Sequence, residues 1–189
     1  MFIKYSSSFN LKSKIHKAVS IALISAGFIP AVNAAETNVN INNPTGTTID
    51  GTIAVTLDDG TSFTVDNDGT IAGTDTDTGL GIFATNATTI TTLTNDGTIS
   101  GTAGTFIGRG IRLQTNSTIA TLTNDGTISG TAGTIIGSGI SLSRSNITNL
   151  TNNDTISGTA GTNSGQGIFL SNISTIITLT NDGTISGTA

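Results

Sequence analysis

The sequence predicts an all-β fold, a parallel β-helix (β-solenoid) with about three strands in each coil of 28–29 residues. The first observation is a repeat: LTNDGTISGTAGT begins at Leu93 and at Leu122, returns with two changes at Leu150, and begins again in a shorter copy at Leu179. The second is composition, because 24 glycines and only 10% charged residues are unlike a helical repeat. The third is alternation of apolar with polar residues, many of them β-branched, which is typical of strands.

Each coil is predicted to contain three short strands. Around Leu122 they cover 110–113, 117–123 and 127–129, and the second is expected to bend between Ile119 and Leu122, because these two apolar residues have opposite parity. Stacked coils would place equivalent residues about 4.8 Å apart. Four apolar ladders are therefore expected: Leu93, Leu122, Leu150 and Leu179; Ile71, Ile99, Ile128, Ile156 and Ile185; Ile82, Ile111, Ile140 and Ile168; and Ala84, Leu113, Leu142 and Leu170. One coil alone closes no core, so the stability must come from stacking.

An asparagine begins the Asn-Asp-Gly corner of each coil. We expect these residues to form a hydrogen-bonded ladder through their side-chain amides: Asn67, Asn95, Asn124, Asn152 and Asn181. The glycine of the corner is expected to supply a positive φ. Asp154 replaces that glycine in one coil and is expected to tolerate the same backbone region.

The chain is predicted to have three parts. Residues 1–34 are interpreted as a signal peptide, because a basic segment precedes the apolar run 18–29 and small residues precede a cleavage point after Ala34. Residues 35–64 are predicted to form an N-terminal cap and an incomplete first coil, and residues 65–189 the repeat solenoid. The solenoid is expected to be truncated in mid-coil, and its uncapped last coil to favour self-association.

The leader, followed by coils that contain TLTNDGTISGTAG, GIxL and STI, resembles the passenger region of monomeric autotransporters (type V secretion). The resemblance covers about Val39 to Ala189. It implies a right-handed helix and an adhesin-like protein of a Gram-negative bacterium, displayed on the cell surface or released, with a host or bacterial surface protein or glycan as partner. Such passengers are followed by an outer-membrane barrel, whose amphipathic strands are absent from these 189 residues. The chain is therefore expected to be the front part of a longer product, at the outer membrane with a barrel and periplasmic without one.

Charge limits the possible partners. After removal of the leader, the chain keeps three arginines and all twelve acidic residues, which gives a formal net charge of −9. Such a surface repels nucleic acid and anionic lipid, so neither is an expected ligand, and no direct membrane insertion is expected of this chain. The absence of cysteine excludes disulfides.

Catalysis is not predicted. Residues 35–189 contain no histidine or cysteine, which excludes Ser-His-Asp and Cys-His chemistry and histidine-based metal sites. Close carboxylates remain at Asp58–Asp59 and Asp75–Asp77, and they leave a polysaccharide-acting β-helix enzyme as an alternative. Aspartate is common in turns, however, so no catalytic residue and no cofactor are predicted.

A metal site is not predicted either. The corner aspartates recur once per coil, and Asn153 interrupts their column: Asp68, Asp96, Asp125 and Asp182. A role in the turn is expected for them, and an occasional calcium ion bound by a loop stays open.

The predicted binding surface is an outward column. Phe83, Arg112, Ser141 and Phe169 each follow the inward isoleucine of the GI segment, and Arg112 is expected to lie over Phe83 as a cation–π pair. We take Phe83, Arg112 and Phe169 as candidates for contact with a partner, against the alternative that a loop packs over them.

A second alternative comes from the threonines that flank the core leucines. They form two outward columns that resemble the threonine arrays of ice-binding β-solenoids: Thr92, Thr121 and Thr178; and Thr94, Thr123, Thr151 and Thr180. Asn149 interrupts the first column. Threonine also has a high β propensity, which explains the two threonine columns without an ice-binding function.

Overall fold

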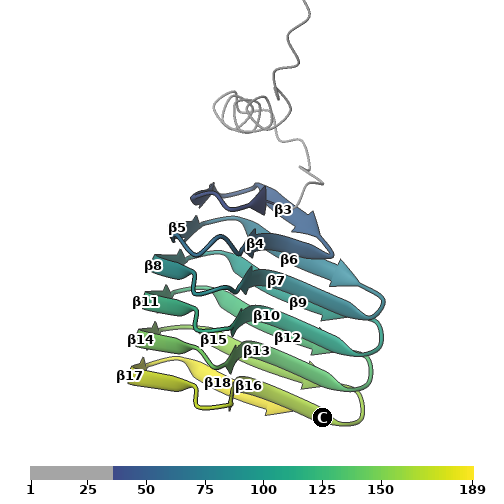
Figure 1. Cartoon of the computed structure of the whole chain (residues 1–189). Coiled ribbons are helices and arrows are strands. Elements are labelled where there is room, and N and C mark those ends of the chain that lie inside the picture. Colours follow the sequence, from purple (N-terminus) through teal and green to yellow (C-terminus); the bar gives the residue numbers. More distant parts are fainter. Residues whose placement is uncertain (1–35) are drawn as a thin grey trace, which may run out of the picture. The chain divides into compact units, whose positions relative to one another are not determined.

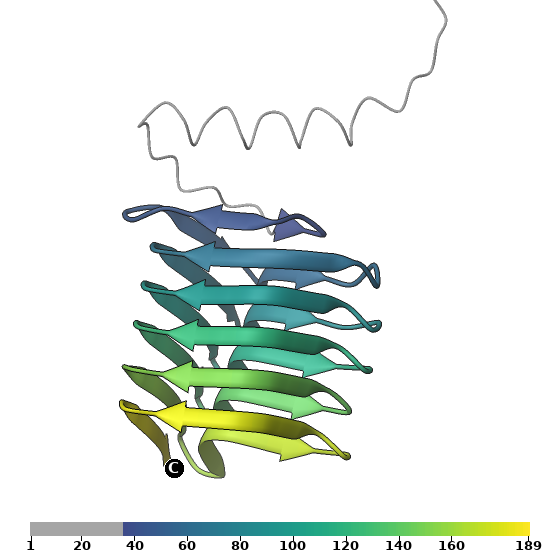
Figure 2. The ribbon, with the colours of Figure 1, turned by 90° about the vertical axis from the view of Figure 1, so that its left-hand side faces the viewer.

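The computed structural model describes residues 36–189, which form a parallel β-solenoid of three six-stranded sheets. All strand pairs are parallel, and no helix occurs in the described range. The coils stack as six layers, and the chain visits the three sheets in turn within each layer (Figures 1 and 2). The predicted all-β solenoid is therefore confirmed. The predicted leader lies outside the described residues.

We number the sheets in the order in which the chain visits them. Sheet I consists of β1 (Glu36–Thr37), β4 (Ile53–Leu57), β7 (Thr78–Ala84), β10 (Ile107–Gln114), β13 (Ile136–Ser143) and β16 (Ser164–Ser171). Sheet II consists of β2 (Ile41–Asn43), β5 (Ser62–Asn67), β8 (Thr89–Asn95), β11 (Thr118–Asn124), β14 (Asn146–Asn152) and β17 (Thr175–Asn181). Sheet III consists of β3 (Thr48–Gly51), β6 (Thr70–Asp75), β9 (Thr98–Ala103), β12 (Thr127–Ala132), β15 (Thr155–Ala160) and β18 (Thr184–Thr188).

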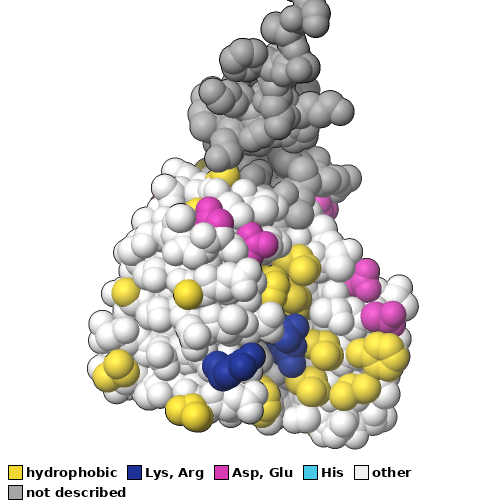
Figure 3. All heavy atoms as spheres, in the orientation of Figure 1, with side chains coloured by type: hydrophobic (Ala, Val, Ile, Leu, Met, Phe, Trp, Pro, Cys, Tyr) yellow, Lys and Arg dark blue, Asp and Glu magenta, His cyan; other side chains and the backbone are white. Residues whose placement is uncertain are grey.

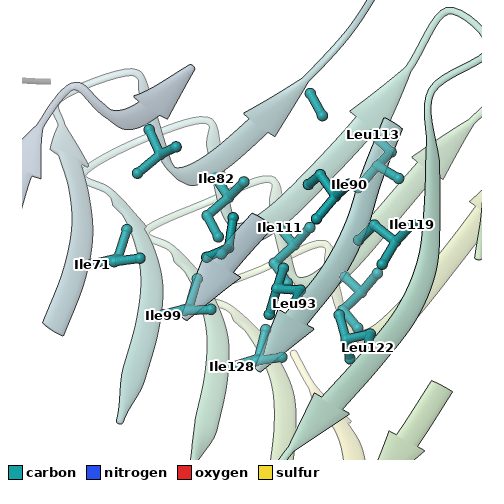
Figure 4. Packing of buried hydrophobic residues seen from close by; sticks show 14 of the residues in the cluster. Ile71, Ile82, Ile90, Leu93, Ile99, Ile111, Leu113, Ile119, Leu122 and Ile128 are labelled. Atoms are coloured by element: carbon teal, nitrogen blue, oxygen red, sulfur yellow. The ribbon is translucent and has the colours of Figure 1, made fainter. Parts of the chain in front are cut away.

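The core is built from the apolar ladders. All four predicted ladders are present in the strand register, and their members in the middle layers are fully buried (Figure 4). The N-terminal section extends them upward through Val65, Ile49, Val55 and Leu57. The first layer, β1 to β3, thus continues the solenoid with shorter strands.

Sheet II bends where the sequence predicts it. In β11 the register runs from Ile119 paired with Ile147 directly to Thr121 paired with Asn149, so Ala120 is passed over. Ile119 and Leu122 both face the core as a result. The strands predicted at 110–113 and 127–129 are also present, but they are longer, as β10 and β12.

The asparagines form a continuous ladder at the C-terminal ends of the sheet II strands. Each side-chain amide nitrogen donates to the side-chain oxygen of the next asparagine at 2.7 Å, from Asn43 down to Asn181. The Nδ2 of Asn124 also donates to the backbone oxygens of Gly126 and Thr155, at 2.8 and 3.1 Å. The ladder therefore ties the corner backbone of one layer to the next, and Asn43 adds a member that the sequence repeat did not indicate.

The expected reason for glycine at these corners is wrong. Gly97, Gly126 and Asp154 do not have a positive φ. Glycine allows a close approach of the layers instead, because a Cβ on Gly126 would lie 2.2 Å from the backbone oxygen of Gly97 in the layer above. This close approach, and not the left-handed region, favours glycine at the corner, although the corner also accommodates Asp154 at the equivalent position one layer below.

Left-handed backbone occurs at a different corner, between sheets I and II. The residues with positive φ there are Asn38, Gly60, Asn86, Ala87, Thr115, Asn116, Arg144, Asn172 and Ile173. The corner at Arg144 has one such residue where the corners directly above and below it have two, because it is one residue shorter: Gln114 pairs with Ser143, 29 positions on, and Thr118 with Asn146, 28 positions on. This deletion explains why the interval from Leu122 to Leu150 is 28 residues.

Candidate binding face

The outer face of sheet I carries the candidate residues in one column. The strand register places Phe83 beside Arg112, Arg112 beside Ser141 and Ser141 beside Phe169. Ile111 and Leu113 on either side of Arg112 are fully buried in the core, so alternation along β10 turns Arg112 outward. We call Phe83, Arg112, Ser141 and Phe169 the Phe–Arg column.

Arg112 and Phe83 interact directly. The guanidinium carbon of Arg112 lies 5.6 Å from the centroid of the Phe83 ring, which confirms the predicted cation–π pair. Both side chains are half-buried. Burial also lowers the pKa of Arg112 below its ordinary value. The pair therefore forms part of a partly desolvated surface.

A second outward column runs beside the first, and the sequence reasoning missed it. It consists of Leu80, Arg109, Ser138 and Gln166, which are neighbours in the register of sheet I, and we call it the bend column. A Cβ on Gly108 would meet Thr131, and one on Gly110 would meet the Ile128 side chain, so both glycines face the interior. Arg109 lies between them and faces outward.

The strands of sheet I bend just after the bend column, with an unchanged register on either side. Gly110 has no partner in the register, and both it and Ile111 face inward. Leu80, Arg109 and Ser138 are buried although they face outward. These three side chains are therefore covered by their neighbours on the outer face. The signal of the bend column in the sequence is a residue between two glycines, as in GLGI, GRGI, GSGI and GQGI.

Arg109 is the most unusual side chain of this face. Only 7% of it is exposed, and its Nε and Nη1 atoms have no hydrogen-bond partner. The hydroxyl of Ser138, next to it in the column, is also buried and unpaired. Burial, and next the charge of Arg112, lowers the pKa of Arg109 to about 10, so Arg109 is charged at neutral pH.

Figure 3 views this face of the molecule. Basic side chains lie near its middle, with hydrophobic side chains close to them, while acidic side chains lie farther up and to the right. Phe106 is more exposed than the half-buried Phe83 and Phe169, at 44%, but it lies in the loop before β10 and outside both columns. The arginine-rich middle is thus an exception on an acidic chain.

The two close pairs of acids are not brought together. Asp58 follows the end of β4, whereas Asp75 precedes β7, so they lie at opposite ends of sheet I. Asp75 accepts hydrogen bonds from the backbone N–H groups of Asp77 and Thr78, which lower its pKa. A general acid needs a raised pKa, so this carboxylate is suited to a turn.

The threonine columns lie on the outer face of sheet II in the expected register. Thr121 is exposed and Thr123 half-buried, on either side of the buried Leu122. The columns are interrupted at Asn149, and Asp66 takes the position of Thr94 one layer higher.

Within residues 36–189, no cluster of histidine, cysteine or acidic side chains has an arrangement that could hold a metal ion. The same residues include no helix that is long and apolar enough to cross a membrane.

Comparisons with known proteins give no relative. No family model, no curated protein and no solved structure matches the chain. The likeness to autotransporter passengers therefore stays a prediction from the sequence.

Proposed function

We propose that this chain is a non-enzymatic exported surface protein, a passenger-type β-solenoid that binds a host or bacterial surface glycan or protein. The single observation that carries this proposal is the outer face of sheet I, where the Phe–Arg column and the bend column lie side by side. Aromatic rings and arginine are the residues that most often supply binding energy at protein surfaces.

The geometry of a solenoid supports this use of the face. Equivalent residues in successive layers lie about 4.8 Å apart, so a column of side chains forms a rigid, linear surface. Phe83 and Phe169 stand three layers apart in the same column, with Arg112 and Ser141 between them. An extended ligand could contact both rings at once without any rearrangement of the backbone.

The binding experiment uses variants that the fold already accepts. Phe83→Ser and Phe169→Ser place in the column the residue that it has at Ser141. The control is Phe106→Ser, which removes an exposed phenylalanine outside both columns. We expect the labelled wild-type chain to bind members of a glycan and surface-protein array, the column variants to lose most of that binding, and the control to keep it. Equal loss in all three variants would refute the assignment of this face.

Export is part of the proposal and has its own test. The basic and apolar segments before Ala34 support removal of a leader during transport. Expression in a Gram-negative host, followed by N-terminal sequencing of the exported protein, should find Ala35 as the first residue. An uncleaved chain that stays inside the cell would contradict this part of the proposal.

A second candidate function rests on the threonine columns of sheet II. Thr121 and Thr123 are two positions apart on a strand, about 7 Å, and their columns repeat about every 4.8 Å. Ice binding through these columns should give thermal hysteresis, which Thr121→Leu would abolish and Asn149→Thr would increase. No hysteresis in the wild-type chain would exclude this function.

A further inference from the structure

We propose that Arg109 and Ser138 form a subsite that recognises the carboxylate of an acidic saccharide. This inference rests on the proposed function of the sheet I face and names the chemical class of its ligand. It is carried by the burial and the missing hydrogen bonds of the two side chains.

The first step concerns the unpaired polar atoms. Three buried side-chain atoms of the described residues have no hydrogen-bond partner, and all three lie in the bend column: Nε and Nη1 of Arg109 and Oγ of Ser138. Buried polar groups are normally paired, and a buried cation without a partner is costly. The asparagine ladder shows that this chain pairs buried amides thoroughly. The unpaired donors of the bend column are therefore available to bind an acceptor group that is not part of the chain.

The second step concerns charge. Arg109 and Arg112 both point outward from β10, and the charge of Arg112 disfavours protonation of Arg109. An anion bound between them would relieve this repulsion and accept hydrogen bonds from both. Guanidinium N–H groups form strong charge-assisted hydrogen bonds with a carboxylate, and the Ser138 hydroxyl can donate a further bond.

The third step selects a saccharide over an acidic peptide. Phe83 lies directly above Arg112 in the neighbouring column, with its ring already in a cation–π contact. A sugar ring with a carboxylate combines, in one rigid unit, an apolar C–H face for the aromatic ring and an anion for the arginine. A peptide carboxylate would use the arginine alone.

Access to the subsite requires only side-chain movement. The Nε and Nη1 atoms of Arg109 are covered in the free chain. Arg112, on the same strand as Arg109, and Gln166, next to Ser138 in the column, are half-buried and have long, unbranched side chains. Rotation of such side chains is fast and inexpensive compared with any change in the strands.

The test uses nitrogen NMR of the guanidinium groups in the purified chain. The chain has three arginines, at 109, 112 and 144, so the ¹⁵Nε signals are few and single substitutions assign them. The probe is an oligomer of D-glucuronate, compared with a neutral glucose oligomer and with acetate. We expect saturable shifts of the Arg109 and Arg112 signals with the glucuronate oligomer, no shift of Arg144, and at least tenfold weaker binding of acetate.

Two variants make the test specific. Arg109→Leu should lower the affinity for the glucuronate oligomer at least tenfold, and the fold should accept it because Leu80 occupies the same column one layer above. Arg144→Leu removes the same charge from an exposed corner and should change the affinity less than twofold. Arg109→Gln, which introduces the side chain found at Gln166 of the same column, serves as a second loss variant if Arg109→Leu does not fold.

Three results would overturn the inference: an unshifted Arg109 signal, equal binding of acetate and the oligomer, or equal loss in Arg109→Leu and Arg144→Leu. The last would indicate general charge attraction and no subsite. These failures are separate from failure of the proposed function. Surface binding on the array without glucuronate binding would refute only the subsite, and glucuronate binding without surface binding would refute only the surface-binding role.

Discussion

Two buried polar side chains, Asn124 and Arg109, illustrate the chemistry of this chain at the scale of the residue. The two N–H groups of the Asn124 amide are shared among three acceptor oxygens, and its side-chain oxygen accepts a hydrogen bond from Asn95, all within the solenoid. Arg109 is almost as buried, but two of its nitrogen atoms are unpaired. The asparagine therefore stabilises the stack, whereas the arginine lowers stability and requires another explanation, which we assign to ligand binding.

Loss of one rung of the ladder should be costly. Asn124→Ala removes the donor to the buried side-chain oxygen of Asn152 and the acceptor of the buried Asn95 amide, so we expect it to destabilise the fold by at least about 2 kcal/mol. That corresponds to a fall of roughly 4–8 °C in Tm, measured by calorimetry. Asn181→Ala is the control, because Asn181 is exposed, and it should cost less than about 1 kcal/mol. Equal costs would show that the ladder adds little to the stack.

Removal of the unpaired cation should have the opposite effect. Arg109→Leu replaces a desolvated charge with an apolar side chain, so we expect a gain of at least about 1 kcal/mol in the free energy of unfolding. Tm would rise by roughly 2–4 °C. Arg144→Leu should stay within about 0.5 kcal/mol of the wild type, since Arg144 is exposed. A destabilised Arg109→Leu would mean that packing of the Arg109 side chain stabilises the fold more than its unpaired charge destabilises it.

At the scale of the element, sheets I and III approach each other so closely that glycine lines both sides. A Cβ on Gly130 of β12 would lie 2.0 Å from the backbone oxygen of Ser138 in β13, and one on Gly108 of β10 would lie 1.8 Å from that of Thr131. Backbone packs on backbone here, with no side chain between. The bend column lies directly on the outside of this contact, so the glycines also fix the position of Arg109.

This contact should not tolerate a methyl group. We expect Gly130→Ala to destabilise the fold by about 1–3 kcal/mol, since the clash is with backbone and no flexible side chain can yield. Gly104→Ala is the matched control, because its Cβ would approach no atom closer than 3.2 Å. Chemical unfolding of both variants provides the comparison. A Gly130→Ala variant as stable as Gly104→Ala would contradict the close packing of the two sheets.

The sequence predicts the parts of each element that depend on periodicity. Repeat spacing and parity suffice for the apolar ladders, for the bend at Ala120 and for the outward position of Arg112. They do not suffice for the bend column, because the bend after Arg109 turns both Gly110 and Ile111 inward and so breaks the alternation on which the parity argument depends. The sequence also could not show why glycine is favoured at the Asn-Asp-Gly corners, since the reason is the short distance between layers.

At the scale of the whole molecule, stacking has an electrostatic cost. The corner aspartates fall in one column along the solenoid, and the pKa of Asp96 is raised by desolvation and by the charges of Asp125, Asp68 and Asp66. Asn153 interrupts the column, and its side chain donates a hydrogen bond to Asp125. An acid whose pKa is raised by folding destabilises the fold when it is charged, and the penalty disappears as pH falls below the pKa of the unfolded chain.

Asp96→Asn should remove this penalty. We expect the variant to have a higher Tm than the wild type at pH 7, and the difference to vanish below about pH 4, where the wild-type carboxyl is protonated as well. Salt at about 1 M should also reduce the difference at pH 7, since the charges are exposed. The measurement is Tm against pH for both proteins. A difference that persists at pH 3 would mean that hydrogen bonding, and not charge, separates them.

Sheets I and II have distinct outer surfaces. Sheet I presents arginines and aromatic rings, and sheet II presents threonine columns. A rigid stack keeps these surfaces apart, so a ligand on one should leave the other unchanged. The central claim is that sheet I is the face that binds.

The most direct test of that claim uses the absence of tryptophan from the chain. Phe83→Trp places a single fluorophore in the Phe–Arg column, and Phe106→Trp places one outside it. Each protein is titrated with the ligand that the surface array identifies. We expect a saturable blue shift of the Phe83→Trp emission and no change in Phe106→Trp. An unchanged Phe83→Trp spectrum at saturating ligand would contradict the assignment of sheet I as the binding face.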